Sequence, residues 1–308
     1  MINYNGKIIE GLEPNLLNRG FLYGDCVFET IKVIDNKIIF WEDHYLRLMS
    51  SLRIIRVEIP IDYTPEFFES QIQNTFSKLS SNFSGRIRLS VYRSGGGLYN
   101  PNSMLPNFLI HIKSDLNNLF KISEANYKVD LFKDYYMNND LLSNLKTNNK
   151  VINVLAGIFA KENELDNCIL LNHKKNVVEF YHGNLFFVKN NNIKTPPLSS
   201  CCLKGILRKK ILSFSKLFPD ISITEEDLSP FELLSADEIW MTNAISGIVP
   251  VTNYRKKMFS NVLAKRFLET INNHLYINCV EDCLVNWTIL NIHLQAQLIC
   301  LSINKYCR

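Results

Sequence analysis

Residues 142–156 read Leu-Ser-Asn-Leu-Lys-Thr-Asn-Asn-Lys-Val-Ile-Asn-Val-Leu-Ala. Apolar residues in the second half recur at helical spacing and predict a helix over about 150–164. The polar first half therefore places Lys146 where a loop leads into a helix, with no acidic residue beside it. A lysine that loses water in such a place has a lowered pKa and can act as a nucleophilic amine, as a Schiff-base lysine does.

Five other segments combine with this one into an ordered set. They are 19–30 (Arg-Gly-Phe-Leu-Tyr-Gly-Asp-Cys-Val-Phe-Glu-Thr), 44–48 (His-Tyr-Leu-Arg-Leu), 179–186 (Glu-Phe-Tyr-His-Gly-Asn-Leu-Phe), 195–198 (Thr-Pro-Pro-Leu) with 205–208 (Gly-Ile-Leu-Arg), and 242–251 (Thr-Asn-Ala-Ile-Ser-Gly-Ile-Val-Pro-Val). Together the six blocks resemble, in order, those of the class IV aminotransferase family, the fold-type-IV pyridoxal-phosphate enzymes. The resemblance extends over residues 1 to about 275.

The resemblance implies a two-domain α+β / α/β fold, with a smaller N-terminal α+β domain and a larger C-terminal pseudo-barrel domain. A chain of 308 residues is long enough for two domains. Polar residues around 113–124 suit a linker between them. The expected organisation is an N-terminal domain at 1–113, a linker at 114–124, a cofactor-binding domain at 125–275 and a tail at 276–308.

Composition narrows the class of protein. Of the residues, 46% are hydrophobic, and 34 basic against 30 acidic residues give a net charge of +4. These charges are spread along the chain, which does not suggest a nucleic-acid partner. Residues 1–20 lack the basic-then-apolar pattern of a signal peptide, so we expect a cytoplasmic enzyme.

The cysteines and the tail predict neither a metal site nor a membrane anchor. Without a secretory signal, the 8 cysteines are expected to be free thiols. Cys279 and Cys283 have near-metal spacing, but no second Cys or His pair follows at a matching interval. Residues 283–304 carry no formal charge, yet many are polar, and 290–298 alternates like a strand. This pattern favours a packed appendage or an ordinary tail over a membrane span.

Local patterns predict the other elements. Asn5-Gly6 suits a type I′ turn, so residues 1–10 are expected to form a hairpin. An apolar stripe predicts a helix over 41–53, and Thr64-Pro65 begins another as N-cap and first helical residue. Strands are expected at 27–34, 37–40, 86–93, 168–171, 177–180, 185–189 and 193–195, and one more helix at 205–217.

The resemblance implies pyridoxal phosphate as the cofactor. Lys146 is then the residue that forms the aldimine with the cofactor aldehyde. Glu179 is cast as the carboxylate that bonds the pyridine nitrogen, which must stay protonated for the ring to accept electrons. Arg47 is cast as the phosphate ligand, because a guanidinium offers two parallel charge-assisted bonds.

Two departures from the family pattern concern the phosphate site. Leu207 and Ala244 stand where many members have a hydroxyl residue, so one or more hydroxyl bonds to phosphate are absent. Backbone N–H groups at the helix start near residue 205 remain available. Phosphate binding is therefore expected to rest on the main chain and Arg47. The expected cofactor-binding residues are Arg47, Lys146, Glu179, Ile206, Leu207, Asn243 and Ala244.

Substrate residues are expected on the strand at 86–93 and its neighbour. The block that runs from Arg93 through three glycines to Tyr99 resembles a segment of the aminodeoxychorismate lyases within the family. Arg93 is accordingly the candidate anchor for a substrate carboxylate, and Arg88 is the next candidate. Phe28 and Thr30, from the Phe-Glu-Thr segment, complete the expected substrate residues.

The same features favour one reaction and leave others open. A substrate amine would displace Lys146, which would then move protons at the substrate Cα as a general base. We predict a 4-amino-4-deoxychorismate lyase that releases 4-aminobenzoate and pyruvate in folate synthesis. Branched-chain and D-amino-acid aminotransferases are the alternatives, and a degenerate paralogue without catalysis is a remote one. The resemblance also implies a homodimer. No metal, nucleic acid or membrane partner is expected, from the cysteine spacing, the spread of charge and the polar tail.

Overall fold

The computed structural model describes residues 2–9, 18–114 and 119–275. The chain divides into two compact units, residues 1–265 and residues 266–308. All the strands belong to the first unit, and residues 266–275, the described part of the second, are helical. The tail predicted at 276–308, with its expected strand and with Cys279 and Cys283, lies outside the described residues.

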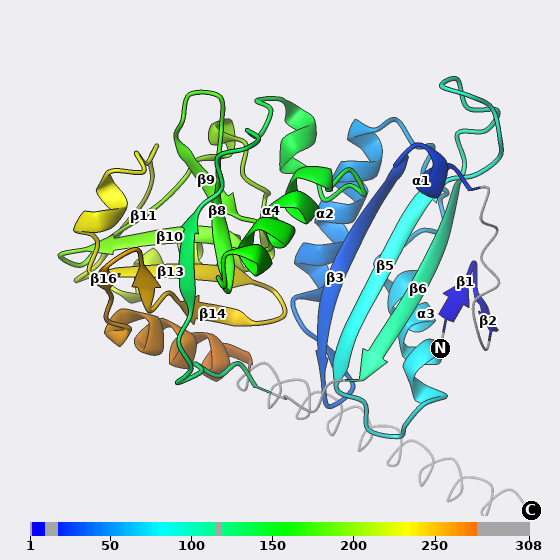
Figure 1. The fold of residues 1–308 in the computed structure, drawn as a ribbon. Coiled ribbons are helices and arrows are strands. Elements are labelled where there is room, and N and C mark those ends of the chain that lie inside the picture. The colour runs from blue at the N-terminus through cyan, green and yellow to red at the C-terminus, as the bar shows by residue number, and fades with distance from the viewer. Residues whose placement is uncertain (1, 10–17, 115–118, 276–308) are drawn as a thin grey trace, which may run out of the picture. The chain divides into compact units, whose positions relative to one another are not determined.

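A six-stranded antiparallel sheet, in the order β2-β1-β6-β5-β3-β4, forms the first part of the chain (Figure 1). Asn5 and Gly6 have φ values of 48° and 84°, so the predicted hairpin is confirmed. The strand predicted at 37–40 ends at Ile38, because Phe40 has a positive φ of 56° and leaves the extended conformation. The strands are β1 Ile2–Tyr4, β2 Lys7–Ile9, β3 Cys26–Ile34, β4 Lys37–Ile38, β5 Gly85–Arg93 and β6 Pro106–Ser114.

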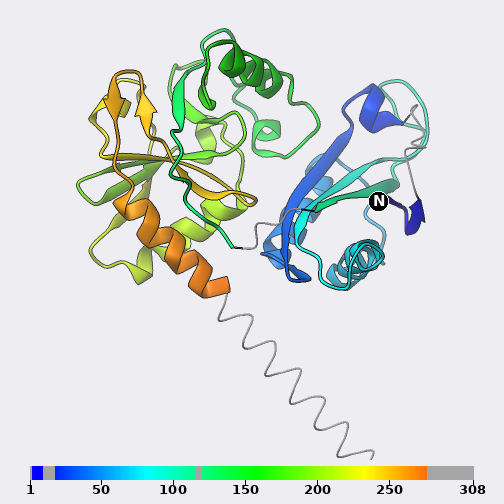
Figure 2. The same ribbon diagram turned by 60° about the horizontal axis from the view of Figure 1, so that its bottom comes forward.

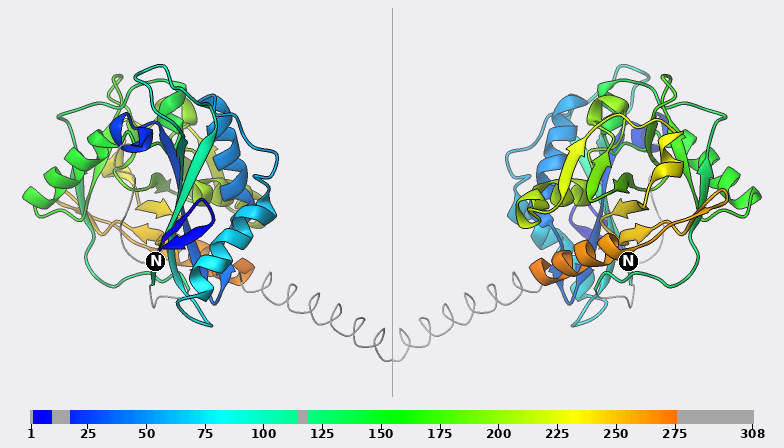
Figure 3. Two further views of the ribbon diagram at one scale, coloured as in Figure 1. Left: turned by 90° about the vertical axis from the view of Figure 1, so that its right-hand side faces the viewer. Right: turned by 90° about the vertical axis from the view of Figure 1, so that its left-hand side faces the viewer.

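Two helices cover one face of this sheet, as the side views show (Figure 3). They are α2 (Trp41–Ile54) and α3 (Pro65–Ser77), and a short α1 (Arg19–Leu22) precedes β3. The Thr64 hydroxyl accepts a bond from the Phe67 N–H at 3.2 Å, which confirms the predicted N-cap. The apolar stripe of α2 is buried against the sheet.

Strand alternation divides the side chains of this sheet between two environments. On β3 and β5, one set of alternate residues packs under the helices, including Ile31 and Leu89, both fully buried. Residues of the other set, such as Phe28, Thr30 and Arg88, point to the opposite face. That opposite face carries the cavity described below.

The rest of the first unit is built on two five-stranded sheets (Figures 1 and 2). The sheet of order β16-β15-β7-β8-β9 contains β7 Lys128–Leu131, β8 Asn167–Leu171, β9 Val177–Phe180, β15 Asn253–Tyr254 and β16 Lys257–Met258. The sheet of order β12-β11-β10-β13-β14 contains β10 Asn184–Lys189, β11 Asn192–Thr195, β12 Ser222–Glu225, β13 Glu238–Asn243 and β14 Gly247–Pro250. The four strands predicted in this region are confirmed, and they pair as two antiparallel hairpins, β8 with β9 and β10 with β11.

Helices connect and cover these strands. The predicted helix that follows Lys146 is confirmed, and its alanines pack on β8. The helix predicted over 205–217 is α-helical only as far as Ser213 and continues as a 3-10 turn, because Pro219 follows and cannot continue a helix. The remaining elements are α4 Val151–Glu162, α5 Ile206–Ser213, η1 Leu141–Asn144, η2 Leu198–Ser200, η3 Phe214–Leu217 and η4 Glu232–Ser235.

One sheet thus precedes the predicted linker at 114–124 and two follow it; the domain boundaries themselves stay a prediction. In the part of the chain that the structure describes, no helix is long and apolar enough to cross a membrane. Within the same residues, no group of three potential ligands could hold a metal ion. The described cysteines are free and buried: Cys26, Cys168, Cys201 and Cys202.

Candidate active site

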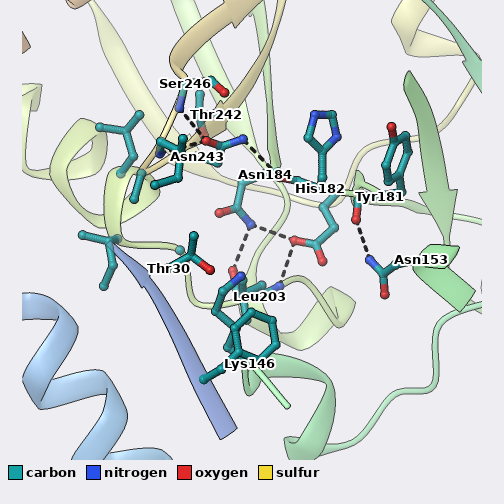
Figure 4. Close-up of a pocket in the computed structure, with 18 of the residues that line it drawn as sticks. Thr30, Lys146, Asn153, Tyr181, His182, Asn184, Leu203, Thr242, Asn243 and Ser246 are labelled. Atoms are coloured by element: carbon teal, nitrogen blue, oxygen red, sulfur yellow. Dashed lines mark hydrogen bonds between the residues drawn. The ribbon is translucent and has the colours of Figure 1, made fainter. Parts of the chain in front are cut away.

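A cavity of about 330 Å³ lies against the open face of β3 and β5. Its other walls come from the segment before α4, the end of β9, the start of α5 and the β13–β14 turn. Figure 4 shows Lys146, Thr30, Asn184 and Asn243 among the residues around it. Segments far apart in the sequence therefore meet at one hollow, and nearly all the predicted site residues lie there.

Lys146 is held in place by its own backbone. Its carbonyl accepts a bond from the Phe28 N–H at 2.8 Å, and the Asn148 N–H donates to the Cys26 carbonyl at 3.0 Å. These two bonds hold the segment against β3, so the Lys146 side chain extends into the cavity. Its Nζ lies 4.7 Å from the centroid of the Phe28 ring. Burial, with the nearby Arg47 guanidinium, lowers the pKa of Lys146 to about 7. The predicted loop-to-helix position is confirmed, since α4 begins at Val151.

Glu179 is the next-to-last residue of β9 and lines the cavity with a buried side chain. One carboxylate oxygen accepts bonds from Asn184 Nδ2 at 2.9 Å and from the Leu203 N–H at 3.0 Å. Burial raises the pKa of Glu179 to about 7, although Lys150 and the Leu203 bond act against it. A carboxylate so placed could bond a protonated ring nitrogen, whose positive charge would favour the ionised acid.

Arg47 reaches the cavity from α2. Its Nε and Nη2 donate to the two oxygens of Glu29 at 2.8 and 2.5 Å, and its Nη1 donates to the Lys204 carbonyl at 2.8 Å. His44 completes this buried cluster, with Nδ1 2.7 Å from Glu29 Oε2. Burial alone would raise the pKa of Glu29, but Arg47 and His44 bring it to about 2. These bonds fix the Arg47 guanidinium in position beside Lys204, the residue that precedes Gly205.

The start of α5 lines the cavity beside Arg47. Gly205 caps this helix without a side-chain bond, so the cap itself engages none of the N–H groups of the first turn. A Cβ at Gly205 would lie 1.9 Å from Asn184 Oδ1, so a larger residue there would displace the Asn184 side chain, which bonds Glu179. On the opposite wall, Asn243 Oδ1 accepts from the N–H groups of Ile245 and Ser246 at 2.9 and 2.7 Å (Figure 4).

These features fit the cofactor that the sequence implies. A half-buried amine, a buried acid and an uncapped helix start with an arginine beside it match the needs of an aldehyde, a ring nitrogen and a phosphate. The Thr242 hydroxyl is buried at the same cavity and, among the described residues, has no hydrogen-bond partner. The cavity also contains Ile206, Leu207, Asn243 and Ala244.

Three of the four expected substrate residues line this cavity as well. Phe28 and Thr30 face it from β3, and Arg88 faces it from β5. The Arg88 guanidinium lies over the Phe28 ring, with Cζ 3.6 Å from the centroid, and it donates to Asn148 Oδ1 at 2.8 Å and Ser90 Oγ at 3.2 Å. Phe28 therefore has both Arg88 and Lys146 against its ring.

Arg93 is not brought to this cavity, contrary to the expectation. It lies at an odd position of β5, so its side chain is on the helix-covered face with Leu89 and not on the face of Arg88. Its guanidinium donates to both oxygens of Asp25, at 3.0 and 3.2 Å, and to the carbonyls of Ile55 and Arg56 at the end of α2. These contacts occupy its donors, so we no longer expect Arg93 to anchor a substrate.

Sequence reasoning overlooked several residues of the cavity wall. Tyr181, His182 and Asn184 belong to the quoted 179–186 block, so their place in that block was an available signal. Arg86 lies two residues before Arg88 on the same face of β5, so the alternation of this strand was the signal that could have indicated it. A place in a quoted block was also an available signal for Lys150 and Asn153, in the 142–156 block, and for Thr242, Ile245 and Ser246, in the 242–251 block. Leu203 lies outside the quoted blocks, and the tertiary structure alone brings it in.

Known proteins resemble this chain over most of its length. Residues 26–254 match the family model described as amino-transferase class IV. A putative branched-chain-amino-acid aminotransferase of Methanocaldococcus jannaschii is 30% identical over 264 residues, covering 84% of this chain and 90% of that protein. An aminodeoxychorismate lyase of Vibrio harveyi is 27% identical over 237 residues, covering 76% and 85%.

Among solved structures, a branched-chain aminotransferase of Thermoproteus uzoniensis superposes with a TM-score of 0.79 at 22% identity. The match covers 87% of this chain and 92% of that one. At this identity the likeness concerns the fold, and it confirms the fold class predicted from the sequence.

Proposed function

Because this chain belongs to the amino-transferase class IV family, we propose that it is a pyridoxal-phosphate enzyme that cleaves 4-amino-4-deoxychorismate to 4-aminobenzoate and pyruvate. Family membership supports the cofactor and the broad class, an aminotransferase or lyase. The choice of the lyase reaction rests on one observation, the cavity wall next to Lys146. The V. harveyi relative, named as an aminodeoxychorismate lyase, is consistent with that choice.

This wall combines an aromatic ring with fixed positive charge. Phe28 offers a flat surface, and Arg88 lies against it with its Nη1 engaged by no described residue. Arg86 lines the same cavity from the same face of β5. A ring-shaped acid with two carboxylates suits such a surface better than an aliphatic side chain, which would need an apolar pocket. The substrate residues we propose are Arg88, Phe28 and Thr30.

When bound, pyridoxal phosphate supplies an electron sink for charge on the carbon that carries the amino group. Lys146, whose pKa is about 7, can accept a proton from that carbon and return one near neutral pH. Glu179 would hold a proton at the ring nitrogen, and Arg47 with the start of α5 would hold the phosphate. Arg88 orients the substrate by a carboxylate. The overall reaction balances without water or a keto acid, since the ring becomes aromatic as pyruvate leaves.

The decisive experiment compares products. The purified protein, loaded with pyridoxal phosphate, is given 4-amino-4-deoxychorismate without any keto acid. Pyruvate and 4-aminobenzoate should form in equal amounts, and the Lys146→Ala variant should form neither. If the protein releases no pyruvate but makes glutamate from amino acids and 2-oxoglutarate, the lyase assignment is wrong.

A branched-chain aminotransferase is the second candidate. The observation in its favour is the M. jannaschii relative, which bears that name at 30% identity. L-leucine, L-valine and, for the D-amino-acid alternative, D-alanine, each with 2-oxoglutarate, test it in the same assay. A degenerate, non-catalytic chain is disfavoured, because Lys146, Glu179 and Arg47 converge on one cavity.

Assembly is a separate part of the proposal. We expect a homodimer, as the family resemblance implies. Light scattering of the loaded protein at assay concentration should give twice the chain mass of 35.7 kDa. A fully active monomer would contradict this expectation.

A further inference from the structure

Lys150 is a second lysine in the catalytic cavity, and the proposed mechanism gives it no task. It is the N-cap residue of α4, and its N–H donates to the Asn148 carbonyl at 2.9 Å. Its own carbonyl accepts the first helical bond, from the Val154 N–H at 2.9 Å. The backbone position is thus fixed at both ends, and the side chain leaves it toward the cavity.

The position of this side chain is unusual among the described residues. Lys150 lines the catalytic cavity and also two neighbouring hollows, of about 680 and 630 Å³. Arg88 and Phe28 line the catalytic cavity and the second of these hollows with it. Lys150 is therefore a residue at which these three spaces adjoin.

No described residue forms a hydrogen bond or ion pair with its ammonium group. The side chain is half-buried, and the charged groups that face it in the cavity are Glu179, Arg47 and Lys146. Glu179 is already bonded to Asn184 and Leu203. A cation that is partly removed from water without a bonded partner is costly, so the site is suited to an incoming anion.

We propose that Lys150 is an anion-binding residue of the catalytic cavity, which receives an anionic oxygen of a molecule bound between Lys146 and Glu179. Two sources can supply such an oxygen, the ring oxygen of the cofactor and a substrate carboxylate. The inference rests on the proposed cofactor site, but it holds for a lyase and an aminotransferase alike, because the substrates of both carry a carboxylate.

The test uses the loaded enzyme and three variants. Lys150→Gln removes the charge and keeps a polar side chain, one atom shorter than that of lysine, and Lys150→Arg keeps the charge. Lys161→Gln, on an exposed residue of the same helix, is the matched control. Circular dichroism checks that each variant is folded.

The first arm measures the cofactor itself. Absorbance of the loaded protein is followed against pH without substrate. If the ring oxygen is the partner, loss of the Lys150 charge should move the spectral midpoint upward by about one pH unit, because the neighbouring cation no longer stabilises the deprotonated form. Lys150→Arg and Lys161→Gln should leave the midpoint in place.

The second arm measures carboxylate binding without turnover. Calorimetric titration with 4-aminobenzoate and with 4-methylpentanoate covers the two substrate classes. If a carboxylate is the partner, Lys150→Gln should raise Kd about tenfold, the scale of a lost charge-assisted bond, and Lys150→Arg should restore it. Neither arm requires turnover. Both measurements can therefore be interpreted even if the protein is not a lyase. If Lys150→Gln matches Lys161→Gln in both arms, the proposal is overturned.

Discussion

Two buried arginine–carboxylate pairs lie at the same sheet but have different surroundings. Arg47 pairs with Glu29 of β3, and Arg93 of β5 pairs with Asp25, which precedes β3. Both guanidinium groups bond two oxygens, and both side chains are less than a tenth exposed. From sequence, each arginine was a candidate for an anionic ligand.

The pairs differ in which end of a helix lies beside them. Arg93 donates to the carbonyls of Ile55 and Arg56, at the negative end of α2. Arg47 lies beside the start of α5, which is a positive end. A cation at a helix C-terminus is satisfied, whereas a cation at a helix N-terminus leaves positive charge that an anion can neutralise. The first pair therefore stabilises the fold, and the second is available to a ligand.

The largest expected effect tests whether the cavity beside Arg47 is the reacting one. Lys146→Ala should lower turnover by at least about 10³-fold, since removal of a nucleophile and base eliminates several catalytic contributions at once. It should also abolish the borohydride-reducible chromophore. Lys150→Ala is the control and should keep that chromophore. If only Lys150→Ala loses it, the wrong lysine has been assigned.

Arg93→Ala tests the structural pair. We expect the unfolding free energy to fall by about 3 kcal/mol, because Asp25 loses two charge-assisted bonds and keeps only Arg19, and two helix-end carbonyls lose their donor. Denaturant titration measures this loss, and Arg56→Ala, at an exposed neighbour, is the control. The variant protein that remains folded should bind pyridoxal phosphate as before. A tenfold rise in the Kd for 4-aminobenzoate would instead restore Arg93 as the candidate anchor for a substrate carboxylate.

The pH dependence of stability should reveal the charge of Glu29. Its pKa is about 2 in the folded protein against an ordinary value of 4.5, so its ionised form stabilises the fold above about pH 4.5. That contribution, on the order of 3 kcal/mol, should be lost as pH falls from 4.5 toward 2. Glu29→Gln should thus destabilise the protein at pH 7 and much less at pH 2.5. An equal difference at both values would exclude this charge effect.

Arg47→Ala should give the smallest of these effects and the most specific. Loss of one charge-assisted phosphate contact is worth about 1.5–3 kcal/mol, so the Kd for pyridoxal phosphate should rise roughly 10- to 150-fold. Dialysis followed by reconstitution, read by absorbance, measures it. Arg53→Ala, exposed on the same helix, should not change the Kd. Equal cofactor retention in Arg47→Ala and Arg53→Ala would show that Arg47 does not bind the phosphate and, like Arg93, only stabilises the fold.

Local sequence was sufficient for most of the framework. Asn5-Gly6 tolerates positive φ at both residues, Thr64 can cap a helix, and β5 alternates between apolar and polar residues, so each element follows from short-range chemistry. The ordered blocks, with Lys146 and Glu179 at their centres, led to the family and to the wall of the cavity.

What the tertiary structure alone decided is which neighbours surround each side chain. The alternation of β5 already separates Arg88 from Arg93, but only packing shows that α2 covers one face and the cavity lies on the other. In the sequence, Glu29 was only part of a quoted block, and the structure shows that α2 brings His44 and Arg47 to it. Lys150 was given no role either, and the structure shows that it lines three hollows. Charge and burial depend on contacts between distant segments, and such contacts are not encoded in any local pattern.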